Sequence, residues 1–212
     1  ILILTYEDSL EADFAVVQAE LALPIEQPDW VVEEAAALPA VEDGVAWPDR
    51  TDLRDLLTIT IDPRDARDFD DAVSLEMLDG GKLRLGVHIA DVSHFVRQED
   101  PVDSEACARG TSVYLVDRVI PMLPPILSTK VCSLNPEVQR FAISLFVDLD
   151  QHGSIKNRRY ERTVIQCGHA LSYEEVQAVL DGTASISRDV DRALFLLDHN
   201  ARNLRLERRA RG

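Results

Sequence analysis

The chain has 212 residues, of which 46% are hydrophobic and 6% aromatic, a composition typical of a folded globular protein rather than a disordered one. No apolar run approaches the roughly 20 residues needed to span a bilayer, and the start, ILILTYEDSLEADF, has neither a basic leader nor an apolar stretch of signal-peptide length. The sequence therefore argues against a membrane protein and predicts a cytoplasmic location.

The formal charge of −16 would disfavour nucleic acid if it were evenly spread. Residues 1–60, however, hold 14 acidic residues against two basic ones, Arg50 and Arg54, for a net −12, which leaves −4 for the remainder. Five acids of that remainder stand in one motif, IDPRDARDFDDAV (61–73), and the last residues, RNLRLERRARG, are locally basic. The acidic composition therefore does not exclude a phosphate substrate.

Residues 1–50 read as an acidic lead-in, punctuated by prolines and without a chemical motif. SLEADFAVVQAELAL favours a helix with Ser9 as its N-cap, and DWVVEEAAAL favours a second short helix from Asp29. We expect a linker or the remnant of a preceding domain. Since the chain begins with Ile1 rather than Met, we also expect it to be a fragment.

Short strand patterns begin at Leu56, and LLTITI ends at Asp62. AVSLEML and KLRLGVHIADV alternate at period two and predict a hairpin across DGG at 79–81. RFAISLFVDLD and SIKNRRYERTVIQ predict a second hairpin across QHG.

Helical patterns are interleaved with these hairpins. One is expected from Ser104 to about Ser112, before an irregular PMLPP loop at 121–125. Ser172 and Glu175 form a capping-box pattern that opens a further helix, and a long helix is expected over 188–209. Hairpins interleaved with helices indicate an α+β fold, a mostly antiparallel sheet packed with helices.

The three cysteines, Cys107, Cys132 and Cys167, stand far apart without C-x-x-C spacing. Neither a disulfide framework nor a cysteine zinc site is indicated. We expect all three to be buried free thiols.

The acidic motif is the strongest chemical signal. Asp62 ends a predicted strand, and Asp68, Asp70 and Asp71 precede the next one, so the loop is held at both ends. Carboxylates this close repel one another unless a cation neutralises them. Oxygen donors without His or Cys favour a hard cation such as magnesium or manganese, and a pair of such ions suits phosphodiester hydrolysis.

Two other interpretations compete with a catalytic metal site. The spacing of an EF-hand calcium loop fails, because a loop counted from Asp62 places Arg67 where glycine is required, and one counted from Asp68 places Val73 there. A solvated acidic loop stays open from spacing alone.

Five blocks resemble one family. IDPRDARDFDDAVSLE, GVHIADVSHFV, RGTSVYLVDRVIPMLP, LSTKVCSLNPEVQRFAIS and LSYEEVQAVL occur in the order of the catalytic (RNB) domain of ribonuclease II and ribonuclease R. The resemblance covers roughly residues 51–212 and implies the N-terminal half of that domain. It also implies a hydrolytic exoribonuclease that degrades single-stranded RNA processively from its 3′ end and releases nucleoside 5′-monophosphates with magnesium.

The resemblance also assigns roles. Asp62 and Asp71 would ligate a first metal ion, whereas Asp68 and Asp70 would complete the site through a second metal or by holding the terminal nucleotide; these two are the catalytic candidates. Asp65 is not part of the family motif. Tyr114 falls where the family stacks a tyrosine on the 3′-terminal base.

Other polar residues are expected to be mainly structural. His88 and His94 are an even number of positions apart, so both would point to the same face of a predicted strand, among apolar neighbours. Asp91 is expected to be a structural hydrogen-bond acceptor. Arg109 and Arg118 could reach phosphates, and Arg109 is the candidate substrate contact, although salt-bridged surface is the simpler interpretation for both.

Later elements of the family domain are absent from the sequence, and no cold-shock domain is recognisable in residues 1–50. We expect a monomer that binds single-stranded RNA. The alternative is a catalytically inactive, RNA-binding relative of the same family.

Overall fold

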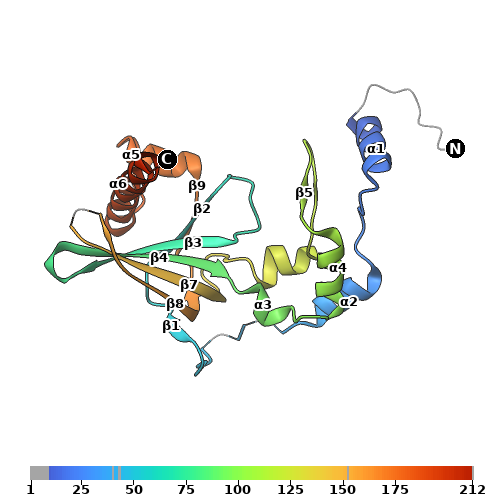
Figure 1. Cartoon of the computed structure of the whole chain (residues 1–212), viewed down its shortest axis with the longest axis horizontal. Helices are drawn as coiled ribbons and strands as arrows, with labels where there is room; N and C mark the ends of the chain where they lie inside the picture. Colours follow the sequence, from blue (N-terminus) through green and yellow to red (C-terminus); the bar gives the residue numbers. More distant parts are fainter. Residues whose placement is uncertain (1–9, 40, 43, 152, 212) are drawn as a thin grey trace. The chain divides into compact units, whose positions relative to one another are not determined.

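A computed structural model of the chain describes residues 10–39, 41, 42, 44–151 and 153–211. Two compact units are present, Ile1–Leu38 with Val96–Ile126, and Pro39–Phe95 with Leu127–Gly212. Each is described by itself, and Figure 1 traces both. None of the described helices is both long enough and apolar enough to cross a membrane.

The first unit contains α1 (Leu10–Leu21), α2 (Asp29–Ala37), α4 (Pro101–Arg109) and a small hairpin of β5 (Val113–Tyr114) and β6 (Val119–Ile120). Helix α2 packs on α4 and buries Val31 and Ala35, while Val102 is buried on α4. Both helices expected in residues 1–50 are present, as α1 and α2. The expected N-cap of the first, Ser9, lies outside the described residues.

Helix α4 begins three residues before the expected start at Ser104 and ends before the expected Ser112. Pro101 fits the first helical position, where its fixed φ costs nothing and no N–H is needed. Gly110, with φ 74°, then ends the helix in the left-handed conformation. Cys107 lies exposed on this helix, so the prediction that all three thiols are buried was wrong for Cys107 and right for Cys132 and Cys167.

The second unit is built on a seven-stranded sheet in the order β1-β8-β7-β4-β3-β2-β9. Its strands are β1 (Thr51–Leu53), β2 (Thr58–Asp62), β3 (Asp71–Leu78), β4 (Lys82–Ala90), β7 (Gln139–Leu149), β8 (Ile155–Gln166) and β9 (His169–Ser172). Both predicted hairpins, β3–β4 and β7–β8, are confirmed. Two pairings are parallel, β1 with β8 and β2 with β9.

Short helical segments punctuate the sheet. A 3₁₀ turn, η1 (Asp79–Gly81), joins β3 to β4, with Gly80 and Gly81 at positive φ as a tight turn requires. Helix α3 (Val92–Phe95) follows β4, and a π-helical segment, η2 (Leu127–Val131), precedes β7. His94 therefore lies on α3, beyond the end of the strand, and the expected strand parity with His88 was wrong.

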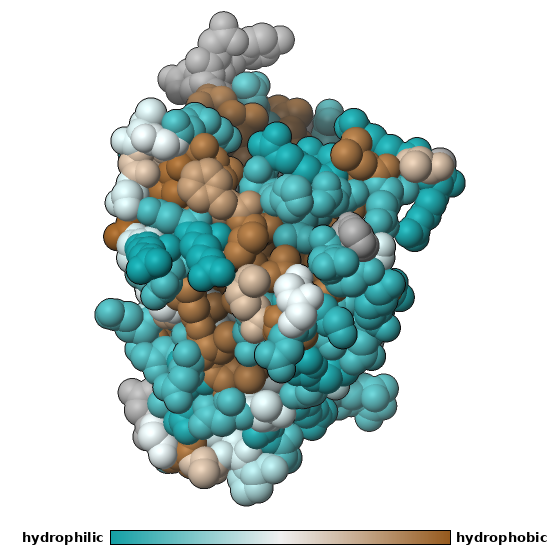
Figure 2. All heavy atoms as spheres, turned by 90° about the vertical axis from the view of Figure 1, so that its left-hand side faces the viewer, coloured by the Kyte–Doolittle hydropathy of each residue, from teal (hydrophilic) through white to brown (hydrophobic). Residues whose placement is uncertain are grey.

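Helices α5 (Tyr173–Leu180) and α6 (Arg188–Ala210) cover part of one face of the sheet (Figure 1). The predicted capping box is present: Ser172 Oγ accepts from Glu175 N, and the Glu175 carboxylate accepts from Ser172 N. The core under these helices is apolar and contains Ile59, Leu171, Val179, Val190, Ala193 and Leu194. On the face seen in Figure 2, hydrophobic side chains gather in a band between hydrophilic ones.

A buried polar chain fills the other face of the sheet. His88, fully buried, contacts Ser144 Oγ through Nδ1 at 2.7 Å and Ser74 Oγ through Nε2 at 2.9 Å. Ser144 in turn contacts Thr163 Oγ1 at 2.7 Å. A Cβ at Gly86 would lie 2.3 Å from Ser74 Oγ, so only glycine fits there. Burial lowers the pKa of His88 to about 4, so the imidazole is neutral at pH 7.

Candidate active site

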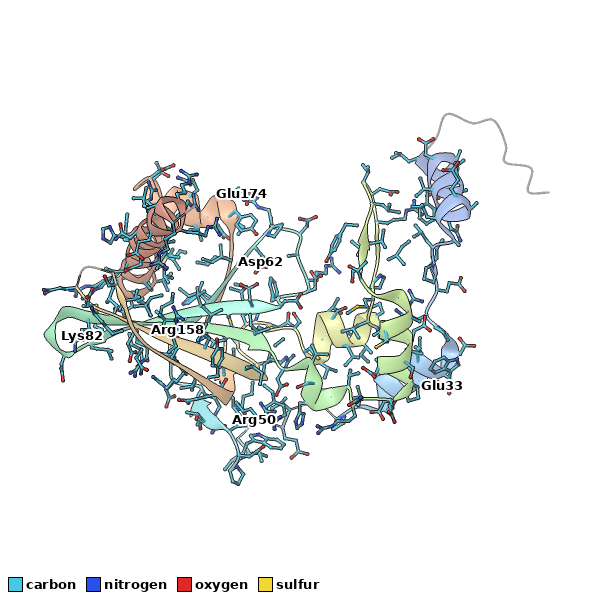
Figure 3. The ribbon with its side chains drawn as sticks, viewed as in Figure 1. Glu33, Arg50, Asp62, Lys82, Arg158 and Glu174 are labelled. Carbon is cyan, nitrogen blue, oxygen red and sulfur yellow. The ribbon has the colours of Figure 1, made fainter. Side chains whose placement is uncertain are left out.

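The acidic motif forms the connection between β2 and β3. Asp62 is the last residue of β2, Asp71 is the first of β3, and Asp68 and Asp70 lie on the loop between them. Figure 3 shows Asp62 at the end of β2, where the chain enters this loop. The antiparallel pairing of Ile59 with Val73 brings the two strands together and so returns the loop to its starting point.

Residues far away in the sequence hold the second half of this loop. Ser133 Oγ accepts from Phe69 N at 3.0 Å and donates to Arg67 O at 3.2 Å. Leu134 N donates to Phe69 O, and Ala90 N donates to Asp70 O, both at 2.9 Å. The backbone on both sides of Asp68 and through Asp70 is therefore fixed by hydrogen bonds to β4 and to the segment before β7.

Negative charge accumulates at the loop. Burial first, and then the carboxylate of Asp71, raise the pKa of Asp62, with Asp68 and Asp70 adding to the effect and the nearby Thr60 hydroxyl opposing it. Burial, followed by the charges of Asp68 and Asp71, raises the pKa of Asp70. All four carboxylates are thus close enough to act on one another electrostatically.

The donor set suits a hard divalent cation. Asp62 Oδ2 is buried without a hydrogen-bond partner of good geometry, an arrangement that costs free energy unless a cation or water meets it. Carboxylate oxygens alone favour magnesium or manganese over zinc. Within the described ranges, however, no three His, Cys, Asp or Glu side chains are gathered tightly enough to enclose an ion. The four carboxylates are therefore neighbours without forming a closed cage.

Asp65 lies exposed on the same loop, in agreement with its exclusion from the motif. Asp91 is a buried structural acceptor, as predicted: Arg50 Nη2 donates to Asp91 Oδ2 at 2.6 Å, and both side chains are 1% exposed. Burial opposes ionisation of Asp91, but hydrogen bonds from Ser93 and Arg50 outweigh it and hold the pKa of Asp91 below its usual value. The Arg50 guanidinium also stacks over Phe141.

Tyr114 and Arg109 belong to the first unit. Tyr114 ends β5 with 69% of its surface exposed, so its ring is available to a ligand. The side chain of Arg109 is 3% exposed and donates to Glu105 Oε1, Pro24 O, Glu26 O and Pro121 O. These contacts fasten residues 24–26 to α4, and a phosphate contact by Arg109 stays a prediction. Arg118 is salt-bridged to Asp117 and Glu11, as the simpler interpretation had it.

A family model described as the RNB domain matches residues 50–212. The chain belongs to the RNB family. The match begins one residue before the boundary expected at residue 51, and the fold of this RNB chain is the expected partial α+β domain.

Curated relatives support the assignment. DIS3-like exonuclease 2 of Schizosaccharomyces pombe is 46% identical over 176 residues, covering 77% of this chain and 19% of the relative. Ribonuclease R of Chlamydia trachomatis is 44% identical over 171 residues, covering 81% of this chain and 25% of the relative. A protein named inactive exonuclease DIS3L2 of Arabidopsis thaliana is 49% identical over 140 residues, covering 66% and 13%. The chain therefore spans about a quarter or less of these relatives.

Among solved structures, RNase R of Mycoplasma genitalium in complex with ribose methylated single-stranded RNA superposes with a TM-score of 0.92 at 28% identity. The match covers 100% of this chain and 33% of that one, so it includes the acidic lead-in as well as the RNB portion.

Two site features were missed from the sequence. Ser133 was not singled out, because a lone serine after a cysteine carries no pattern and its partners are backbone groups 64 and 66 positions away. Arg50 was counted only as a charge. The expected role of Asp91 as a structural hydrogen-bond acceptor called for a donor, and Arg50, one of two basic residues in the first 60, was a candidate for it.

Proposed function

We propose that this chain supplies part of the active site of a magnesium-dependent, hydrolytic 3′-to-5′ exoribonuclease that acts processively on single-stranded RNA and releases nucleoside 5′-monophosphates. The observation that carries the proposal is the complete set of four carboxylates on one hydrogen-bonded loop in a member of the RNB family. Manganese is an alternative ion for the same oxygen donors.

Each carboxylate has an expected task. Asp62 and Asp71 would hold one metal ion, and Asp68 and Asp70 would complete the site. Once bound there, the ion would polarise the scissile phosphate of the RNA and activate a water. Because Ser133, Leu134 and Ala90 fix the loop backbone, only the carboxylate side chains would need to turn to receive it.

Tyr114 would stack on the terminal base. Its exposed ring supports this role, since stacking on an aromatic face tolerates any base and contributes about 1–3 kcal/mol. Tyr114→Phe should therefore keep RNA affinity, whereas Tyr114→Ala should lose about ten-fold or more. Equal affinity for both variants would remove the stacking role.

The direct test is a cleavage assay. RNA of about 20 nucleotides, labelled at its 5′ end, is incubated with magnesium and the 212-residue chain, or with any longer polypeptide that carries it. Stepwise shortening from the 3′ end that stops in EDTA is the expected result. Absence of shortening in both preparations, or shortening that persists in EDTA, would refute the proposal.

A second candidate is an RNA-binding protein without hydrolysis. It is supported by the relative whose name calls it inactive, which shares 49% identity over 140 residues with this chain. The intact carboxylates count against it. RNA binding without product in the same assay would favour it.

A further inference from the structure

Strand β8 presents two different faces. On one, Arg159 is paired with Glu161 and stacks over Phe146, and Thr163 joins the buried polar chain. The residues Arg158, Tyr160 and Arg162 alternate along the other face, and Lys156 precedes them where the pairing of β7 with β8 shifts register, which gives three cations and one aromatic ring. We call these four residues the β8 stripe.

The stripe is open to solvent. Tyr160 is 72% exposed, the side chain of Lys156 is 57% exposed, and Arg158 and Arg162 are exposed. Strand β1 pairs with β8 only from Thr163 to Ile165, so in the part of the chain that the structure describes, the stripe lies on an open edge of the sheet. Figure 3 shows Arg158 on this strand, apart from Asp62.

Two cations of the stripe, Arg158 and Arg162, form no ion pair among the described residues. Lys156 pairs with Asp150 at 2.9 Å. Over the described ranges, neither Arg158 nor Arg162 has a side-chain hydrogen bond or ion pair, and Arg162 acts on Asp91 only through its charge. Arg159, between them on the opposite face of the same strand, is by contrast paired with Glu161. A free guanidinium is a fork of donors matched to phosphate oxygens.

The end of the stripe opens into a polar hollow. A volume of about 590 Å³ is bounded by Lys156, Asn157 and Arg158 of β8 and by Glu207 and Arg211 of α6. Glu207 is already paired with Arg211. The hollow is within the size range of small-ligand sites, and the Arg158 guanidinium is its cation without an ion pair.

Protection of an open edge against strand pairing is the simplest alternative. Charged edge residues commonly serve that purpose. Charges of either sign would prevent another strand from pairing with this edge. That purpose does not explain a largely exposed tyrosine between two arginines that have no ion pair.

We propose that the β8 stripe is an accessory track for the phosphodiester backbone of single-stranded RNA, with Arg158 and Arg162 on phosphates and Tyr160 stacked on a base. Alternate residues of a strand are about 6.7 Å apart, a repeat that suits successive nucleotides of an extended strand. Three strands separate β8 from β2, which places the stripe roughly 19 Å from the strand that carries Asp62. The inference rests on the proposed function, because RNA held here would be RNA that the carboxylates act upon.

The test measures binding apart from cleavage. Fluorescein-labelled oligouridine of about 20 nucleotides is titrated with the 212-residue chain in EDTA, at several salt concentrations, with fluorescence anisotropy as readout. Arg158→Ala/Arg162→Ala is compared with Arg188→Ala/Arg192→Ala, a control that removes two exposed cations from α6 and gives the same net charge. Tyr160→Phe and Tyr160→Ala complete the set, and circular dichroism verifies that each variant is folded.

The stripe variant should bind about ten-fold more weakly, and the slope of log affinity against log salt should lose about 1.4 in magnitude, or 0.7 per phosphate contact. The α6 control should keep the wild-type affinity and slope, and Tyr160→Phe should bind more tightly than Tyr160→Ala. Equal effects in the stripe and control variants would overturn the proposal. Competition by polyglutamate at lower concentration than by oligouridine would also overturn it, and would indicate an acidic protein partner instead.

Cleavage with magnesium is measured in parallel. RNA binding that depends on the β8 stripe, without any cleavage, would support the accessory track and refute the proposed hydrolysis. Cleavage of RNA together with equal RNA binding by the wild type and the stripe variant would support the hydrolysis and refute the accessory track.

Discussion

The hydroxyl of Ser133 accepts a hydrogen bond from the backbone N–H of Phe69 at 3.0 Å, across 64 positions of sequence. Phe69 separates Asp68 from Asp70, so this bond reaches the centre of the acidic loop. Ser133 is 1% exposed, and water cannot easily replace its hydroxyl. The positions of the two carboxylates on the loop therefore depend on a residue that carries no charge.

Ser133→Ala should weaken both the fold and the proposed hydrolysis. A buried N–H left without a partner costs about 1–3 kcal/mol, and a loosened support for metal ligands typically costs about 10- to 100-fold in activity. Urea unfolding and the cleavage assay measure the two effects. Ser104→Ala, which removes an exposed hydroxyl, should change neither. Wild-type cleavage by Ser133→Ala would show that the loop holds its position without this bond.

Asp70→Asn should abolish hydrolysis while sparing RNA affinity. A lost metal contact acts on transition-state charge and should lower the rate by about 100-fold or more. Asp65→Asn is the matched control, because it makes the same chemical change at an exposed position of the same loop. A comparable loss of rate in the two variants, or a loss of binding as large as the loss of rate in Asp70→Asn, would contradict the assigned role.

Acidification should destabilise the protein through His88. The folded state holds the pKa of His88 at about 4, below the unfolded value of 6.5. Above pH 6.5 both states are neutral and the imidazole has no effect on stability. Between pH 6.5 and 4 only the unfolded chain takes up the proton, so stability falls with pH by about 3 kcal/mol in total.

His88→Gln removes this titration while keeping groups able to meet Ser74 and Ser144. The difference in unfolding free energy between pH 7 and pH 4.5 should therefore be smaller in His88→Gln than in the wild type. His199→Gln, at an exposed histidine of α6, should keep the wild-type difference. The same pH dependence in all three proteins would mean that His88 is not neutral in the folded state.

Asp91→Asn should be strongly destabilising. The side chains of Arg50 and Asp91 are each 1% exposed, and removal of one partner of a buried pair typically costs about 3–5 kcal/mol because the other charge is left uncompensated. Asp148→Asn, which breaks the partly exposed pair with Arg84, should cost about 1 kcal/mol or less. Urea denaturation compares the two, and similar losses would argue that water reaches Arg50.

Local patterns predicted the local structure. Period-two alternation identified β3, β4, β7 and β8, and the Ser172–Glu175 pair identified the start of α5. The pairings of β1 and β9 were not predicted, because parallel neighbours of three or four residues are joined by no short turn. The packing of α2 on α4 was missed for the same reason, since Val31 and Val102 are distant in sequence.

In the candidate site, too, the local cluster of residues was predictable and the contacts distant in sequence were not. The clustering of Asp62, Asp68, Asp70 and Asp71 within ten residues indicated a candidate site, and the family resemblance then separated these four from Asp65. Their supports were not predictable, because hydrogen bonds to backbone atoms leave no mark on residue type. Arg109 illustrates the converse: its charge suggested a ligand contact, whereas four protein oxygens already engage its guanidinium.

The parallel pairing of β2 with β9 has a kinetic consequence. Ile59 of β2 pairs with His169 of β9, which lies 110 positions later in the sequence. The outer edge of β2, the strand that ends at Asp62, therefore stays unpaired until β9 is available. Contacts of such high sequence separation form slowly, because a long loop must close before they contribute. The hairpins should therefore fold early, and the carboxylate loop should reach its final form only once the residues up to Ser172 have left the ribosome.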